Sequence, residues 1–96
     1  MNINEKLKEE LKEIVWDYEV SLEELIQILE GRKKSFSLNR EKILARLLLS
    51  VNWYKLLEIF GPHILKEILN DEVLKYIHIE SLRQDFIYAR EVLSEL

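Results

Sequence analysis

The sequence predicts an all-α fold, a single compact domain of about six short helices that spans residues 1–96. Only two glycines and one proline are present, so the chain has few residues suited to the turns of a β-sheet. Leu, Ile, Glu and Lys dominate the composition, as is typical of helical proteins. Apolar residues also recur at intervals of three and four along the chain, as they do on the buried side of a helix.

Two helices are expected in the first third of the chain. The first runs from about Asn4 to Tyr18, with apolar residues on one side and charged residues on the other. The second begins with Ser21 and Glu24, which have the spacing of a capping box, in which each side chain bonds the backbone amide of the other residue. It is expected to end at Gly31, because glycine readily adopts the left-handed conformation that closes a helix.

The stretch 52–71 is expected to form two short helices that meet at Gly61 and Pro62. Asn52 is the expected N-cap of the first of these helices, and Asn39 is the expected N-cap of the helix before them. Pro62 suits the first turn of the second helix, where its missing amide costs nothing.

The helix that follows Asn39 is apolar around more than half of its circumference. A helix of this kind lies at the centre of a fold or covers an interface. Phe36 precedes it in the connection 32–38 and is expected to fold back on the core. The apolar residues of the helix are Ile43, Leu44, Leu47, Leu48 and Leu49.

Two more helical segments are expected near the C-terminus. Asn70 or Asp71 caps a short segment, and Ser81 with Gln84 is expected to form a second capping box at the start of the last helix. The spacing of four and three in the last helix is that of a packing seam, formed by Leu82, Phe86, Ala89, Leu93 and Leu96.

Charge is segregated along the chain, although the net charge is only −4. Residues 1–30 carry three lysines against nine acidic residues, whereas residues 31–46 carry six basic residues against one acidic residue. Cations just after a helix C-terminus commonly stabilise its exposed carbonyls, which is a structural interpretation of this segment. The other interpretation is a docking surface for an acidic or phosphate-bearing partner. The candidate binding residues in the segment are Arg32, Lys33, Lys34 and Arg40.

No motif in the sequence indicates an enzyme or a cofactor site. The absence of cysteine excludes disulfides and thiolate metal ligands. His63 and His78 do not have a zinc-binding spacing, so we expect both to be structural or surface residues. The chain lacks the glycines of a phosphate-binding loop, and its serines have no neighbouring His-Asp pair. We therefore expect a non-enzymatic protein that needs no cofactor.

The sequence also indicates where the protein resides. The chain opens on a charged run without the apolar region of a signal peptide. Its densest apolar region, residues 43–60, is interrupted by polar residues and is too short to span a membrane. We expect a cytoplasmic protein with no membrane partner.

Trp53 and Tyr54 stand at the start of the helix that follows Asn52. We expect Trp53 to pack in the core, because the first turn of a short apolar helix usually buries its aromatic residue. Aromatic residues are also enriched at protein interfaces, and the apolar surplus of this helix and the one before it leaves room for an interface. The occupants that we expect are a protein partner or a second copy of the chain in a homodimer.

Nucleic-acid binding through the segment 32–46 is the alternative function. Residues 40–61 have the length of a helix-turn-helix motif. The second helix of that motif, however, offers only Tyr54, Lys55 and Glu58 for contacts with base edges. The overall acidity of the chain also works against phosphate affinity.

The pattern RLLLSVNWYKLLEIFG, followed by ILNDEVLKYI and SLRQDFIYAREVL, resembles small helical bacterial proteins that are encoded beside nucleotidyltransferase-type toxins. Those proteins are often interpreted as the antitoxin-like partners of the toxins. The similarity covers about residues 40–93 and rests on a tryptophan-bearing helix that ends near a glycine and on a last helix that starts with Ser-Leu. It implies a bacterial protein that acts by occluding a partner, and it carries over no functional residue.

Overall fold

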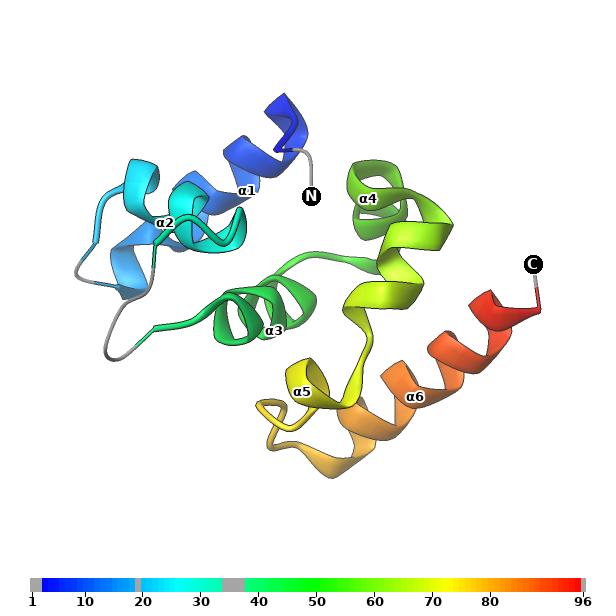
Figure 1. Cartoon of the computed structure of the whole chain (residues 1–96). Coiled ribbons are helices and arrows are strands. Elements are labelled where there is room, and N and C mark those ends of the chain that lie inside the picture. Colours follow the sequence, from blue (N-terminus) through cyan, green and yellow to red (C-terminus); the bar gives the residue numbers. More distant parts are fainter. Residues whose placement is uncertain (1–2, 19, 34–37, 96) are drawn as a thin grey trace.

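In the computed structural model, five α-helices begin at an asparagine or serine whose side chain caps them (Figure 1). In each case the side-chain oxygen accepts from the backbone amide three residues further on, at 2.8–3.2 Å. A cap of this kind contributes about 1 kcal/mol, because it satisfies an amide that the helix itself leaves without a partner. The capping residues are Asn4, Ser21, Asn39, Asn52 and Asn70.

The structure describes residues 3–18, 20–33 and 38–95, and over these ranges the fold is all-α, as the sequence predicts. Phe36 and Lys34 lie outside the described residues. The elements are α1 (Glu5–Ile14), the 3₁₀ turn η1 (Val15–Asp17), α2 (Leu22–Leu29), α3 (Arg40–Ser50), α4 (Trp53–Ile68), α5 (Asp71–Leu74) and α6 (Glu80–Ser94).

The first two helices follow the sequence prediction with two adjustments. The helix expected from Asn4 to Tyr18 is α-helical only as far as Ile14 and then tightens into η1. Ser21 caps α2 as expected, but the Glu24 carboxylate binds Lys33 rather than returning to the Ser21 amide. A lysine is a stronger partner for a carboxylate than a neutral amide, because both groups carry charge.

Gly31 ends α2 in the manner that the sequence predicts. Its φ is +78°, and its amide donates to the Ile28 carbonyl at 3.0 Å. The following amide, that of Arg32, donates to the Gln27 carbonyl at 2.9 Å. These two bonds form a Schellman motif, which supplies donors to the last carbonyls of the helix.

The two helices expected in the stretch 52–71 form one element, α4, with a kink at Gly61. The φ and ψ of Gly61 are +76° and 161°, a combination that is essentially confined to glycine. Pro62 follows and opens the second half of α4, where its missing amide and fixed φ suit a first helical turn. The corner therefore lies where the sequence places it.

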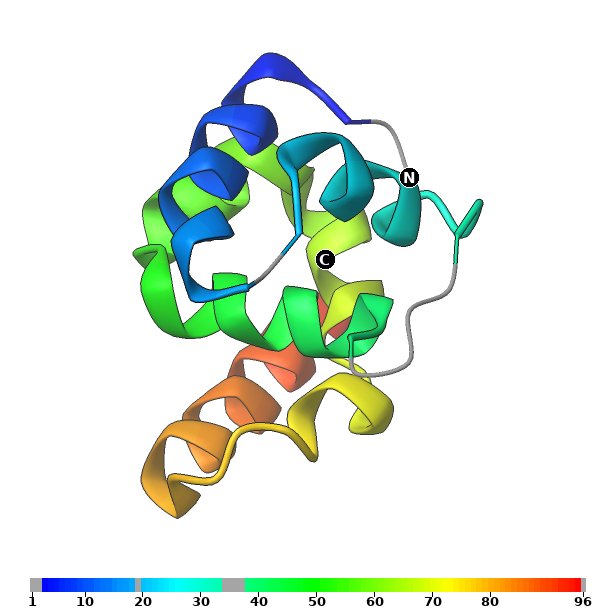
Figure 2. The same cartoon turned by 90° about the vertical axis from the view of Figure 1, so that its left-hand side faces the viewer.

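α3 is the central helix, with α1 and α2 on one side and α5 on the other (Figures 1 and 2). Its apolar residues lie in the core, apart from Leu49, which remains 44% exposed. α4 starts beside the C-terminal end of α3, its second half lies near Arg40 at the other end of α3, and α6 packs against α4. The buried residues of α3 are Ile43, Leu44, Ala45, Leu47 and Leu48.

Two polar contacts join α1 to the first half of α4. The side-chain amide of Asn4 donates to the Ile59 carbonyl at 2.9 Å, close to the kink. Lys6 Nζ lies 2.6 Å from Glu58 Oε1. Asn4 thus caps its own helix with its oxygen and binds α4 with its nitrogen.

The capping box predicted at Ser81 and Gln84 is wrong. α6 begins at Glu80, so Ser81 already lies inside the first turn, and the N-cap residue Ile79 offers no side-chain bond. The Gln84 side chain donates instead to the Glu80 carboxylate at 3.0 Å. Arg83 binds that carboxylate and also the carbonyl of Ile77. These contacts fix the chain that precedes the helix, and α6 starts earlier in the sequence than the predicted capping box would place it.

We expect Gly61→Ala to lower the free energy of unfolding by about 1–3 kcal/mol, because alanine is strained in this backbone conformation. An added Cβ meets no atom within 4 Å, so the loss reports on the backbone alone. Pro62→Ala is the neighbouring control and is expected to cost about 1 kcal/mol or less. Urea denaturation measures both. Equal losses in the two variants would contradict the role assigned to Gly61.

The contact between Lys6 and Glu58 predicts a pH dependence of stability. The hydrogen bond from Lys6, together with the charge of Lys55, lowers the pKa of the Glu58 carboxyl below its ordinary value. The contact therefore stabilises the fold above the ordinary carboxyl pKa, and its contribution is lost as the pH falls through the lowered pKa.

We expect Glu58→Gln to lower the midpoint of thermal unfolding slightly at about pH 7 and to leave it unchanged at a pH below the lowered pKa of Glu58, where the wild-type carboxyl is protonated as well. Glu10→Gln removes a partly exposed carboxylate that has no ion pair among the described residues and serves as the control. A midpoint difference that is the same at both pH values would argue against this contact.

Candidate functional site

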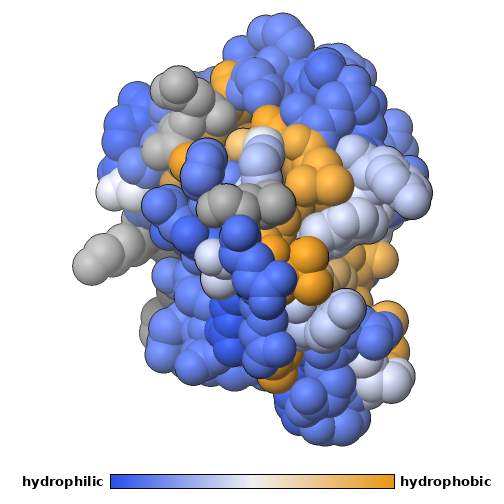
Figure 3. Space-filling model, turned by 90° about the vertical axis from the view of Figure 1, so that its right-hand side faces the viewer, coloured by the Kyte–Doolittle hydropathy of each residue, from blue (hydrophilic) through white to orange (hydrophobic). Residues whose placement is uncertain are grey.

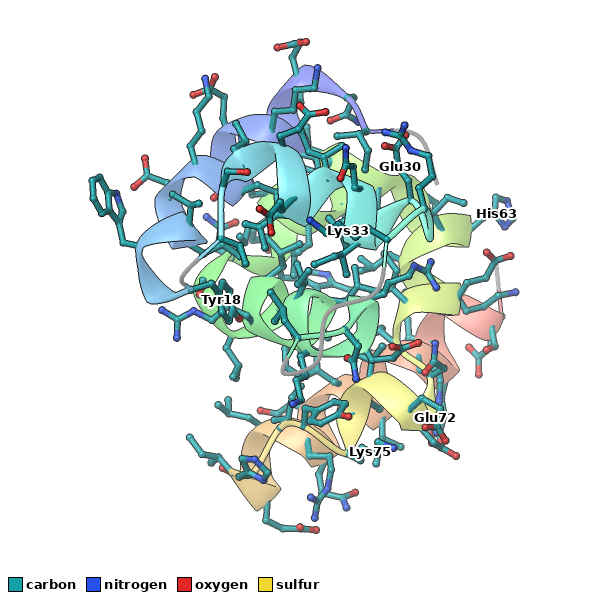
Figure 4. The ribbon with its side chains drawn as sticks, turned by 60° about the vertical axis from the view of Figure 1, so that its left-hand side comes forward. Tyr18, Glu30, Lys33, His63, Glu72 and Lys75 are labelled. Atoms are coloured by element: carbon teal, nitrogen blue, oxygen red, sulfur yellow. The ribbon has the colours of Figure 1, made fainter. Side chains whose placement is uncertain are left out.

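The basic segment is largely occupied by contacts within the chain. Arg32 Nη2 lies 2.5 Å from Glu30 Oε1, and Lys33 Nζ lies 3.4 Å from Glu24 Oε2. Figure 4 shows Glu30 and Lys33 on the same side of the molecule, around the end of α2. These pairs neutralise part of the positive charge that the sequence concentrates there, and they favour the structural interpretation of the segment.

Arg40 is the first residue of α3 and has no ion pair among the described residues. It lines a hollow of about 260 Å³ between the end of α2 and the start of α3. Two residues of its lining, Lys33 and Leu38, flank in sequence the residues 34–37 that the structure does not describe, and we assign the hollow no ligand. The other described residues of its lining are Ile28, Gly31, Lys33, Leu38, Asn39 and Glu41.

Trp53 and Tyr54 begin α4 and differ in their exposure. Trp53 is half-buried against the core, as expected, whereas 83% of Tyr54 is exposed. They lie at the opposite end of α3 from Arg40, a separation of about 16 Å along an 11-residue helix. The basic residues and the aromatic residues therefore do not form one continuous surface.

Apolar residues gather on the side of the molecule where α4 and α6 lie. Figure 3 shows them as a band between two hydrophilic regions. On α4, three residues at helical spacing are only half-buried: Trp53, Leu57 and Phe60. On α6, Tyr88 is 68% exposed and Val92 is 43% exposed. We call the surface that these residues form with Tyr54 the α4–α6 face.

Sequence reasoning missed the contribution of α6 to this face. Of the seam that the sequence predicts, Leu96 lies outside the described residues, Leu93 is buried, and the remaining three are half-buried: Leu82, Phe86 and Ala89. Tyr88 and Val92 do not belong to that seam, and they are four residues apart, so they share another side of the helix. The four-residue spacing of Tyr88 and Val92 is the feature of the sequence that could have indicated a second apolar side of α6.

The described residues contain no cluster of side chains arranged to hold a metal ion: within 3–18, 20–33 and 38–95, no group of three or more His, Asp or Glu side chains has such an arrangement. His63 and His78 are both exposed, and Figure 4 shows His63 pointing outward, away from the other labelled side chains. In the same ranges no buried side-chain N or O atom lacks a hydrogen-bond partner.

No described helix has both the length and the apolar character needed to cross a membrane. Comparisons with protein-family models, with curated proteins and with solved structures found no match for this chain.

The exposure of Tyr54 predicts that its loss is tolerated by the fold. We expect Tyr54→Ala to change the free energy of unfolding by about 0.5 kcal/mol or less, as is usual for exposed positions. Leu56, two residues away, is 1% exposed, and Leu56→Ala should cost about 2–5 kcal/mol. Urea denaturation compares the two. A large loss in Tyr54→Ala would assign this residue to the fold instead of the surface.

Proposed function

We propose that this protein is a non-enzymatic protein-binding module and that the α4–α6 face is its binding surface. The observation that carries the proposal is the exposure of two tyrosines, Tyr54 on α4 and Tyr88 on α6, together with the apolar band on the side of the molecule where these two helices lie. Tyrosine is enriched among the residues that dominate binding energy at protein interfaces. Contiguous apolar surface of this kind marks interaction sites more often than isolated exposed residues do.

The burial of α3 changes which helices can form the binding surface that the sequence suggests. The apolar residues of α3 are in the core, apart from Leu49, so they are not available to a partner. On α4, Trp53, Leu57 and Phe60 are only half-buried, and α6 adds Tyr88 and Val92. The proposal therefore moves from the third and fourth predicted helices to α4 and α6.

The specific form that we propose is an antitoxin-like partner, a bacterial and cytoplasmic protein that occludes the active surface of another protein. The resemblance over residues 40–93 suggests this role, and those residues include all of α4 and almost all of α6. Occlusion needs only shape and surface, which agrees with a proposal that assigns no catalytic residue. A homodimer through the same face is the other arrangement that such a surface supports.

The experiment is affinity purification from the native host with the wild-type protein and two variants. We expect one protein to co-purify in stoichiometric amount and to stay bound at about 0.5 M salt, where exposed charges are largely screened. The double variant Tyr54→Ala/Tyr88→Ala should lose it. Trp16→Ala is the matched control, because Trp16 is an aromatic residue that is 88% exposed outside α4 and α6.

The opposite pattern would reject the proposal. Loss of the partner in the Trp16 variant, with retention in the double variant, would place the binding surface elsewhere. Co-purification of nucleic acid alone, released by moderate salt, would support the nucleic-acid alternative. Light scattering across a dilution series distinguishes a homodimer from a complex with another protein.

A further inference from the structure

The packing of α6 on α4 leaves an apolar pair uncovered on the outer side of α6. Tyr88 and Val92 are four residues apart, so their side chains are neighbours on the helix surface. The opposite side carries the seam residues Leu82, Phe86 and Leu93, which pack against the core. We call the pair Tyr88 and Val92 the outer ridge of α6.

Three carboxylates surround the outer ridge. Asp85 and Glu91 are each three residues from Tyr88, and Glu95 is three residues from Val92, so each lies about one helical turn from a ridge residue. All three side chains are exposed, and none forms an ion pair within the described part of the chain. The ridge is therefore an apolar strip with an uncompensated negative border.

The two arginines of α6 do not neutralise this border. Arg83 binds the Glu80 carboxylate and the Ile77 carbonyl. Arg90 donates to the Leu69 carbonyl at 3.0 Å and to the Asp71 carboxylate at 2.9 Å. Both cations are thus used to attach α6 to the chain that precedes it, on the side away from the ridge.

The carboxylates are also placed where they do not help the helix. Glu91 and Glu95 lie at its C-terminal end, where the helix dipole favours cations, and the last turn contains no basic residue. These two acids are four residues apart, a spacing at which like charges repel. The helix also lacks a side-chain N-cap. α6 is therefore poorly stabilised by its own sequence, and a positive charge from outside would relieve the repulsion.

We propose that the outer ridge of α6 binds a cationic amphipathic helix of a protein partner. The apolar stripe of that helix would cover Tyr88 and Val92, and its Lys or Arg residues would pair with Asp85, Glu91 and Glu95. A second copy of α6 does not fit, because its own carboxylates would face these three. The inference rests on the proposed function and adds the chemistry of the partner.

The test uses three model peptides of about 15 residues, locked in a helical conformation by a side-chain staple, since unlocked helices of that length are marginal in water. All three carry the same leucine stripe, flanked by Lys, by Ser or by Glu. Fluorescence anisotropy measures their affinity for the full chain. We expect the Lys peptide to bind about tenfold more tightly than the Ser peptide, and the Glu peptide to bind most weakly, with the preference fading as salt rises.

Two triple variants separate local charge from net charge. Asp85→Asn/Glu91→Gln/Glu95→Gln should abolish the preference for the Lys peptide. Glu10→Gln/Glu13→Gln/Glu23→Gln removes the same three charges from α1 and α2, at residues that form no ion pair among those described, and should preserve the preference.

The outcomes distinguish this inference from the function on which it rests. Equal binding of the three peptides, weakened in each case by Tyr88→Ala/Val92→Ala, would reject the cationic partner and retain an apolar docking surface. An equal loss of the preference for the Lys peptide in both triple variants would also reject the inference, because the net charge of the protein would then explain that preference. Failure of all three peptides to bind would reject the ridge as a docking site. The proposed function would still be tested separately, by the purification from the native host, which probes the α4–α6 face as a whole.

Discussion

The fold depends on removing α3 from water. Five of its eleven residues are buried apolar side chains, and each gains about 1.5–3 kcal/mol from burial if it is a leucine or isoleucine. No single neighbour can cover a helix that is apolar over more than half of its circumference. α1 and α2 therefore pack on one side, α5 packs on another, and α4 runs along α3 from its C-terminal end toward Arg40. The caps and the Gly61 corner place these helices at angles that make this enclosure feasible.

α6 stands apart from that arrangement, and the proposed function follows from its position. It packs on α4 rather than on α3, and Leu93 is its only buried residue in the described structure. Two arginine contacts hold it against the preceding chain, while its outer side keeps Tyr88 and Val92 in water. An element with few buried contacts is the part of a domain that a partner can most readily complete, because little of its surface is already used.

The number of charges in a segment of the sequence does not show which of them remain unpaired in the fold. The basic segment has the largest positive excess of the chain, yet Arg32 and Lys33 are paired with glutamates from the end and the start of α2. The last helix carries two arginines against three acidic residues in sequence, yet Arg83 and Arg90 are directed toward the preceding chain. Its outer carboxylates are consequently left alone. The unpaired charge of α6 is thus visible only once the partners of each ion are known.

The sequence by itself determined the all-α class, three of the five N-caps with Asn70 as one of two choices for a fourth, the helix end at Gly31 and the corner at Gly61, because each is set by residues within one or two helical turns. It also indicated that Trp53 packs on the core. Only the tertiary structure decided that the apolar surplus of α3 is buried, that Tyr54 is exposed, and that α6 starts at Glu80. These outcomes depend on residues distant in sequence, such as Ile77 for Arg83 and Leu69 for Arg90. The spacing of apolar residues along a helix indicates which of its sides is apolar, but the packing of the other helices decides which part of that side remains exposed to water.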